Sequence, residues 1–154
     1  MDLALNNYLT EKDIKDIFLK DVFLDINDLI LDDFKNNLDA TKETKIPTKR
    51  EEDGAFDIYA NFDEDYIMIK PHETVMIPTG IAMALPEGTF GAIFARSGLA
   101  TKKGLAPANK VGVVDADYRG EIMVALHNHS NTPVTVENGE RIAQMVIAPF
   151  LKAE

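Results

Sequence analysis

The feature that most constrains this chain is a series of short apolar runs from Ala55 onward, each separated from the next by a turn signal. Short runs rich in branched or alternating apolar residues favour strands, and Pro- or Gly-containing junctions favour turns. The expected strands cover residues 56–60, 66–69, 74–77, 80–85, 91–95, 111–114, 121–128, 134–136 and 141–147. Their spacing is typical of a sandwich, barrel or jelly roll rather than of βαβ units.

Two local signals stand out within this β-rich part. Asn138-Gly139 lies between two strand-like runs, which is a strong signal for a hairpin. Residues 97–103 form the only segment of this part that we expect to be a short helix. The sequence therefore predicts a mainly β domain.

Residues 1–40 have a different texture, with no Gly, no Pro and many Asp. Their apolar residues recur at helical spacing, so we predict an α-helical extension of one or two amphipathic helices. It is expected to pack on the main domain; the alternative is a docking arm for another subunit or a protein partner. Residues 41–54 are predicted to be a linker or entry segment, and residues 55–154 the β domain.

Composition limits the classes of function. The net charge is −10, with 26 acidic and 16 basic residues, which disfavours a nucleic-acid partner. The absence of Cys excludes disulfides, thiol catalysis and cysteine-ligated metal centres. We see no membrane span or secretory signal and expect a cytoplasmic protein. His127 and His129 are expected at a surface or interface rather than in a zinc site.

Four polar clusters lie beside the apolar runs. Residues 112–120, Gly-Val-Val-Asp-Ala-Asp-Tyr-Arg-Gly, could form a hairpin with charged residues or part of a functional site. Arg96-Ser97-Gly98 opens the expected helix, where it could bind phosphate or form an ordinary cap, with Ser97 bonded to the backbone and Arg96 in a salt bridge. Asp57 lies inside an apolar run and needs a partner, either an arginine or a hydrated metal. Gln144 is expected to be a hydrogen-bonded amide.

The order of these clusters resembles that of a known family. Residues 55–60, 96–100, 112–120 and 139–144 are similar to the first four signature motifs of the trimeric dUTP diphosphatases, and the resemblance spans about residues 46–150. It implies a β-clip or jelly-roll-like distorted barrel. It also implies a homotrimer with active sites at subunit interfaces, which hydrolyses dUTP to dUMP and diphosphate with Mg²⁺.

The resemblance also implies roles for single residues. Asp115 would be the general base that activates water for attack on the α-phosphate. Asn109 would read the uracil edge, and Tyr118 would pack against the deoxyribose. Ser97, Gly98 and Gln144 would hold phosphate oxygens, and Arg96 would organise the subunit interface. Asp57 would contribute to the metal site from the second shell, and Asp117 would be a structural residue of the turn.

Two departures from the family pattern keep alternatives open. The Gly-rich fifth motif, with its arginine, is not found before the chain stops at Glu154, so we expect impaired catalysis. The helical extension has no counterpart in the common pattern. The alternative functions are a catalytically weak or inactive dUTP-binding regulatory protein and, less favoured, a dCTP deaminase-type enzyme, because residues 121–126 lack the deaminase pattern.

Overall fold

The computed structural model describes residues 44–45 and 47–152, and these form nine strands and one helix. The strands are β1 (Phe56–Tyr59), β2 (Tyr66–Ile69), β3 (Thr74–Pro78), β4 (Thr89–Ala95), β5 (Leu105–Pro107), β6 (Gly112–Val114), β7 (Met123–Asn128), β8 (Val134–Glu137) and β9 (Arg141–Pro149), and the helix is α4 (Ser97–Lys103). The mainly β prediction is confirmed. The predicted N-terminal helices lie outside the described residues.

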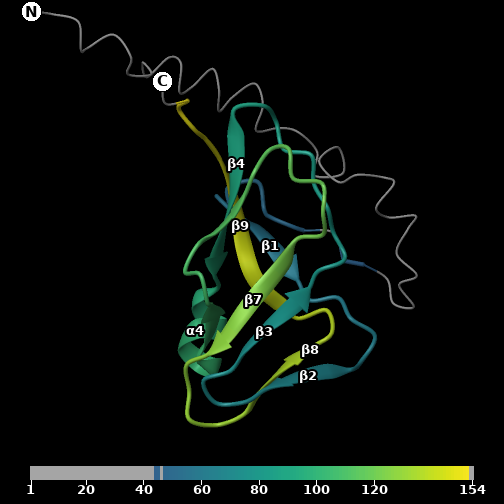
Figure 1. Cartoon of the computed structure of the whole chain (residues 1–154), viewed down its shortest axis with the longest axis vertical. Coiled ribbons are helices and arrows are strands. Elements are labelled where there is room, and N and C mark those ends of the chain that lie inside the picture. The colour runs from purple at the N-terminus through teal and green to yellow at the C-terminus, as the bar shows by residue number, and fades with distance from the viewer. Residues whose placement is uncertain (1–43, 46, 153–154) are drawn as a thin grey trace, which may run out of the picture.

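The strands form three antiparallel sheets, in the orders β1-β9-β4-β6, β2-β8 and β3-β7-β5. Figure 1 shows β9 between β1 and β4, with α4 at one end of β4 and the β2-β8 pair beside β3. No closed barrel forms among the described strands. The finer β-clip or jelly-roll-like arrangement therefore stays a prediction.

One apolar core joins these sheets. Its fully buried side chains come from every sheet, including Ile58 of β1, Ile69 of β2, Ile77 of β3, Leu126 of β7 and Met145 of β9. Side chains on one face of each strand are buried together, because every second residue of a strand points to the same face. The opposite face of the four-stranded sheet carries Asp57 and Gln144 together with exposed apolar side chains such as Phe94 and Val113.

The run at residues 80–85 differs from its prediction as a strand. Ile81, Met83 and Leu85 are buried, but the run joins none of the three sheets. Gly80 has a φ of +68° at the start of the run, which breaks the extended conformation. Apolar content predicted burial correctly here, whereas sheet pairing depended on neighbours that the sequence does not specify.

The hairpin predicted at Asn138-Gly139 is wrong, although the turn is present. Glu140 N–H donates to the Glu137 carbonyl at 3.0 Å, but β8 pairs with β2 and β9 pairs with β1 and β4. The Asn138 side-chain oxygen accepts the Phe62 N–H at 3.1 Å, and Gly139 N–H donates to the Ala60 carbonyl at 2.9 Å. These contacts hold the turn against the β1–β2 connection, so the chain crosses between sheets.

The described part of the chain contains no helix long and apolar enough to cross a membrane. The only described helix, α4, has its basic residues Lys102 and Lys103 in the last turn. It ends at Gly104, whose φ of +67° closes the helix in the left-handed conformation. This C-cap turns the chain directly into β5.

Candidate functional site

An ion-paired cluster occupies one end of the four-stranded sheet. Arg96 Nε donates to Asp57 Oδ1 at 2.8 Å, and Arg141 Nη1 donates to Asp57 Oδ2 at 3.1 Å. Gln144 donates its amide N–H to the Ala95 carbonyl at 2.9 Å. Two guanidinium groups share one carboxylate, so these charged groups together keep a net positive charge suited to an anion.

Sheet register explains why these residues meet. Asp57 pairs with Gln144 across β1 and β9, and Gln144 pairs with Phe94 across β9 and β4. Directly paired residues project from the same face. Arg96 follows Phe94 by two positions, so it continues this face just beyond the strand.

A β-bulge brings Arg141 to the same face. Arg141 and Gln144 are three positions apart, so a regular strand would place them on opposite faces. The pairing shifts between Ile58 and Tyr59, and both Ile142 and Ala143 are buried. The extra residue at the bulge re-aims the Arg141 side chain toward Asp57.

This cluster lines a pocket of about 1170 Å³. The lining residues are Thr48, Lys49, Arg50, Asp53, Gly54, Ala55, Asp57, Phe94, Arg96, Arg141, Gln144 and Val146. Although the whole chain carries a net charge of −10, four of these residues are basic and two are acidic. The pocket is therefore a local exception to the acidic character of the molecule.

Ser97 and Gly98 begin α4 beside this cluster, and both are exposed. Arg96 is the N-cap residue and makes no side-chain capping bond. The alternative that this segment is an ordinary Ser97 cap is wrong, because Ser97 already lies in the helix. The part of that alternative that paired Arg96 with an acid is confirmed.

The second cluster follows β6 and is a turn rather than a hairpin. Tyr118 N–H donates to the Asp115 carbonyl at 3.1 Å, and the next strand, β7, belongs to another sheet. Asp115 and Tyr118 are exposed. The described residues offer Asp115 no ion pair, so its carboxylate faces solvent, where it could bind a water molecule.

Asp117 differs from its expected role in the turn. Its carboxylate makes no hydrogen bond to a described residue; the side chain that bonds within the turn is that of Arg119, whose Nη1 donates to the Ala116 carbonyl at 2.7 Å. Asn109 lies in the preceding turn between β5 and β6. A Cβ on Gly112 would lie 3.3 Å from the Asn109 Nδ2, so Gly112 lets this amide approach the strand closely.

The two clusters lie toward opposite ends of β4. Val114, immediately before Asp115, pairs with Gly91, whereas Arg96 follows the last residue of β4. At about 3.3 Å per residue, the strand from Gly91 to Arg96 spans about 16 Å. A single copy of the chain therefore presents the Asp115 turn and the Arg96 cluster as separate half-sites.

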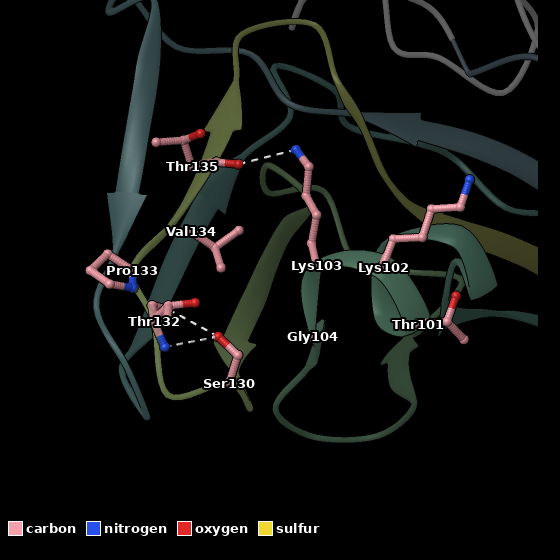
Figure 2. Close-up of a pocket in the computed structure, with 9 residues that line it drawn as sticks. All are labelled: Thr101, Lys102, Lys103, Gly104, Ser130, Thr132, Pro133, Val134 and Thr135. Carbon is pink, nitrogen blue, oxygen red and sulfur yellow. Dashed lines mark hydrogen bonds between the residues drawn. The ribbon is translucent and has the colours of Figure 1, made fainter.

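A second pocket, of about 530 Å³, lies between α4 and the start of β8 (Figure 2). Lys103 donates to the Thr135 carbonyl at 3.2 Å and pairs with Glu140 at 2.6 Å. Its charge is thus neutralised within the fold. None of the predicted site residues lines this pocket, and we do not assign it a ligand.

Sequence reasoning assigned no role to Arg141 or Glu121. Arg141 could have been suspected because Asp57 required a cationic partner, and the structure supplies two arginines. The position of Arg141 beside Asp57 depends on the β-bulge, and no sequence signal predicts that bulge. Within the described residues, no group of three or more His, Asp or Glu side chains is arranged to hold a metal ion.

The structure thus combines a mainly β domain, a cationic pocket suited to an anion and an exposed carboxylate turn. The dUTPase family model matches residues 41–154. This chain therefore belongs to the dUTPase family, as its four motifs predict.

Individual relatives agree with this family assignment. The deoxyuridine 5'-triphosphate nucleotidohydrolase of Desulfitobacterium hafniense (strain DSM 10664 / DCB-2) is 52% identical over 99 residues, which cover 64% of this chain and 65% of that protein. The protein of the same name from Hydrogenobaculum sp. (strain Y04AAS1) is 49% identical over 115 residues, covering 69% of this chain and 80% of that protein. The chain thus spans slightly less than two thirds of the Desulfitobacterium protein.

A solved structure shows the same fold. The crystal structure of dUTPase from Streptococcus mutans has a TM-score of 0.68 and 31% identity, covering 75% of this chain and 94% of that chain. The Staphylococcus bacteriophage 80alpha dUTPase G164S mutant with dUpNHpp has a TM-score of 0.66 and 25% identity, covering 75% and 82%.

Proposed function

We propose that this protein hydrolyses dUTP to dUMP and diphosphate. The observation that carries the proposal is that the chain, a member of the dUTPase family, presents both a separate cationic pocket and an exposed Asp115 carboxylate that has no ion pair among the described residues. Relatives that are about half identical bear the name deoxyuridine 5'-triphosphate nucleotidohydrolase. The substrate, the reaction and the residue roles that follow are parts of this proposal.

Asp115 acts as the general base. A carboxylate that is exposed, and that no described residue pairs with, stays available to accept a proton from water, which then attacks the α-phosphate. Tyr118 packs its half-exposed ring against the deoxyribose, and Asn109 binds the uracil edge. A close-fitting turn rejects the thymine methyl group by its size and rejects cytosine by its reversed hydrogen-bond pattern.

The Arg96 end of the sheet binds the phosphate chain. Ser97, Gly98 and Gln144 hold phosphate oxygens, and Arg96 organises the pocket through its pair with Asp57. Backbone N–H groups at the start of α4 and the excess guanidinium charge both favour a polyanion there. The positive charge of this pocket locally offsets the acidic character of the rest of the molecule.

The complete site requires a second copy of the chain. A span of about 16 Å along β4 separates the Asp115 turn from the Arg96 pocket of the same chain, which is too far for both to bind one nucleotide closely. We infer that neighbouring subunits of a homotrimer contribute the two half-sites. This arrangement places the Asp115 turn of one subunit beside the Arg96 cluster of the next.

Mg²⁺ assists the reaction when it is bound with the substrate. The described residues contain no carboxylate cluster for the ion, and both oxygens of Asp57 already accept hydrogen bonds from arginine. The donor set therefore fits an ion held mainly by phosphate oxygens and water, as Mg²⁺ prefers. A second-shell role for Asp57 remains a prediction, and its contacts favour the arginine partners.

Further features of the protein belong to this proposal. They are the β-clip or jelly-roll-like closure, the helical extension over residues 1–40 with its protein partner, the division at residues 41–54, and a cytoplasmic location. The overlap with the Streptococcus mutans dUTPase supports the fold part of this set.

Diphosphate release tests the activity directly. The purified protein should release diphosphate from dUTP with Mg²⁺ and lose this activity on chelation, with little turnover of dCTP or dTTP. The absence of dUTP turnover above the background of an Asp115→Asn variant would sink the proposal. Ammonia release from dCTP would instead identify a deaminase, and tight dUTP binding without turnover would identify a regulatory protein.

Subunit mixing tests the shared site. Asp115→Asn and Gln144→Ala proteins should each have low activity, and unfolding and refolding them together should restore part of it. Mixed trimers recover a site that combines an intact Asp115 with an intact Gln144. Mixtures that show only the average of the two separate activities would contradict a site built across subunits.

A further inference from the structure

Hydrogen bonds join the loop after β3 to the segment that follows the Asp115 turn. Glu121 Oε1 accepts the N–H groups of Thr79 and Gly80, at 3.1 and 2.8 Å. The Thr79 hydroxyl donates to the Ile122 carbonyl, and Ile122 N–H donates to the Ile81 carbonyl at 2.8 Å. Side chain and backbone thus hold the two segments together.

Gly80 allows the geometry of the hydrogen bonds between the Glu121 carboxylate and the loop after β3, which we call the Glu121 anchor. Its φ is +68°, and a Cβ at this position would lie 2.1 Å from the Asn61 amide nitrogen. Only a glycine satisfies both constraints without a rearrangement. The result is two successive N–H groups that converge on one carboxylate oxygen, an arrangement that favours negative charge.

Tyr118 contacts the backbone of Glu121, the residue whose carboxylate forms this anchor. Its hydroxyl donates to the Glu121 carbonyl at 3.0 Å. A Cβ on Gly120 would lie 2.6 Å from the Tyr118 hydroxyl oxygen, so the phenol packs directly on the glycine backbone. The ring is 46% exposed, yet its orientation is fixed by Gly120 and Glu121.

We propose that Glu121 is a positioning residue that sets the sugar specificity of the site. Its carboxylate fixes residues 120–122 on the β3 loop, and its carbonyl then holds the Tyr118 ring where a ribose 2′-hydroxyl would clash. This inference rests on the proposed function, because it takes the Tyr118 ring as the surface that meets deoxyribose. Glu121 itself does not touch the substrate.

The test compares Glu121→Gln with Glu140→Gln. Glu140 is a control because it also accepts a backbone N–H, from Glu137 at 3.0 Å, and in addition pairs with Lys103, but it belongs to the β8–β9 turn. The neutral amide weakens the anchor with little change in shape. We expect the ratio of kcat/KM for dUTP to that for UTP to fall about three- to tenfold in Glu121→Gln, the size of one weakened charge-assisted contact, and to hold in Glu140→Gln.

Two further measurements separate positioning from general stability. Tyr118→Phe should reduce the same ratio, and combining it with Glu121→Gln should add little, because both changes release the same ring. In the protein without nucleotide, backbone hydrogen exchange over residues 115–122 should be faster in Glu121→Gln than in the wild type. The exchange of β9 should remain unchanged.

The outcomes distinguish this inference from the proposed function. An active wild type whose Glu121→Gln variant keeps its preference for dUTP over UTP, even with lowered stability, overturns the positioning role. If the wild type shows no turnover, the proposed function fails, and the dUTP-to-UTP ratio is then measured from binding constants. Equal binding of dUTP and UTP by the wild type would also overturn the inference.

Discussion

The two half-sites are built by different physical means. The Arg96 cluster stands on paired strands, and two arginines and one carboxylate fix one another at 2.8 and 3.1 Å. The Asp115 turn leaves the sheet and is held by hydrogen bonds to backbone groups, with the Asp115 and Tyr118 side chains exposed. One end therefore relies on sheet register and charge, and the other on turn geometry.

This difference suits the proposed binding of the two parts of a nucleotide. A phosphate chain is recognised mainly by charge, which tolerates small displacements of a rigid cationic pocket. A nucleoside is discriminated by shape and by single hydrogen-bonding groups, which require a closely positioned turn. Substitutions at the two ends should consequently have different signatures in stability and in kinetics.

The largest effect is expected at the turn, in catalysis alone. Asp115→Asn should lower kcat by about 10²- to 10⁴-fold, the usual contribution of a general base, and leave the thermal midpoint nearly unchanged. Asp117→Asn, two residues away, is the control and should retain most activity. Steady-state kinetics and thermal unfolding measure both; equal losses in the two variants would contradict a specific role for Asp115.

The next effect is expected in the ion-paired cluster, in both stability and binding. Asp57→Asn removes the charge that Arg96 and Arg141 share, which should cost about 1–3 kcal/mol in free energy of unfolding. The apparent KM for dUTP should change together with stability because the arginines lose their orientation. Denaturant unfolding and kinetics test this; unaltered stability would show that the cluster is not held by Asp57.

A smaller effect is expected from a methyl group under the tyrosine ring. Gly120→Ala places a Cβ against the Tyr118 hydroxyl and should displace the ring. The stability cost should be about 1 kcal/mol, because the exposed ring can move outward. Gly54→Ala is a control, since its Cβ would meet no atom within 4 Å. Discrimination against UTP should weaken only in Gly120→Ala.

The smallest effect concerns pH and lies away from both half-sites. Desolvation, followed by the nearby charges of His127, Lys110 and His72, lowers the pKa of His129 below its usual value of 6.5. The unfolded chain then binds more protons than the folded one as the pH falls through this range, so stability should decrease from about pH 7 toward pH 5. His129→Gln should flatten this dependence slightly.

Local features of this fold were predictable from the sequence, whereas the pairing of distant segments was not. The family, the mainly β class and α4 were predicted correctly, because motif order and apolar spacing are local properties of the chain. The roles predicted for Asp115, Tyr118, Asn109, Ser97, Gly98 and Gln144 remain predictions. The Asn138-Gly139 hairpin was wrong because a turn signal does not say which strands will pair.

The order of residues along the chain already contains a carboxylate-rich segment after a strand and an Arg-Ser-Gly segment before a helix. The pairing of Asp57 with two arginines, the bulge that re-aims Arg141 and the contact of Tyr118 with Glu121 arise from the folded arrangement. The physical reason is that these contacts depend on strand register and on close approach between segments distant in sequence. Such contacts arise only when the sheets pack.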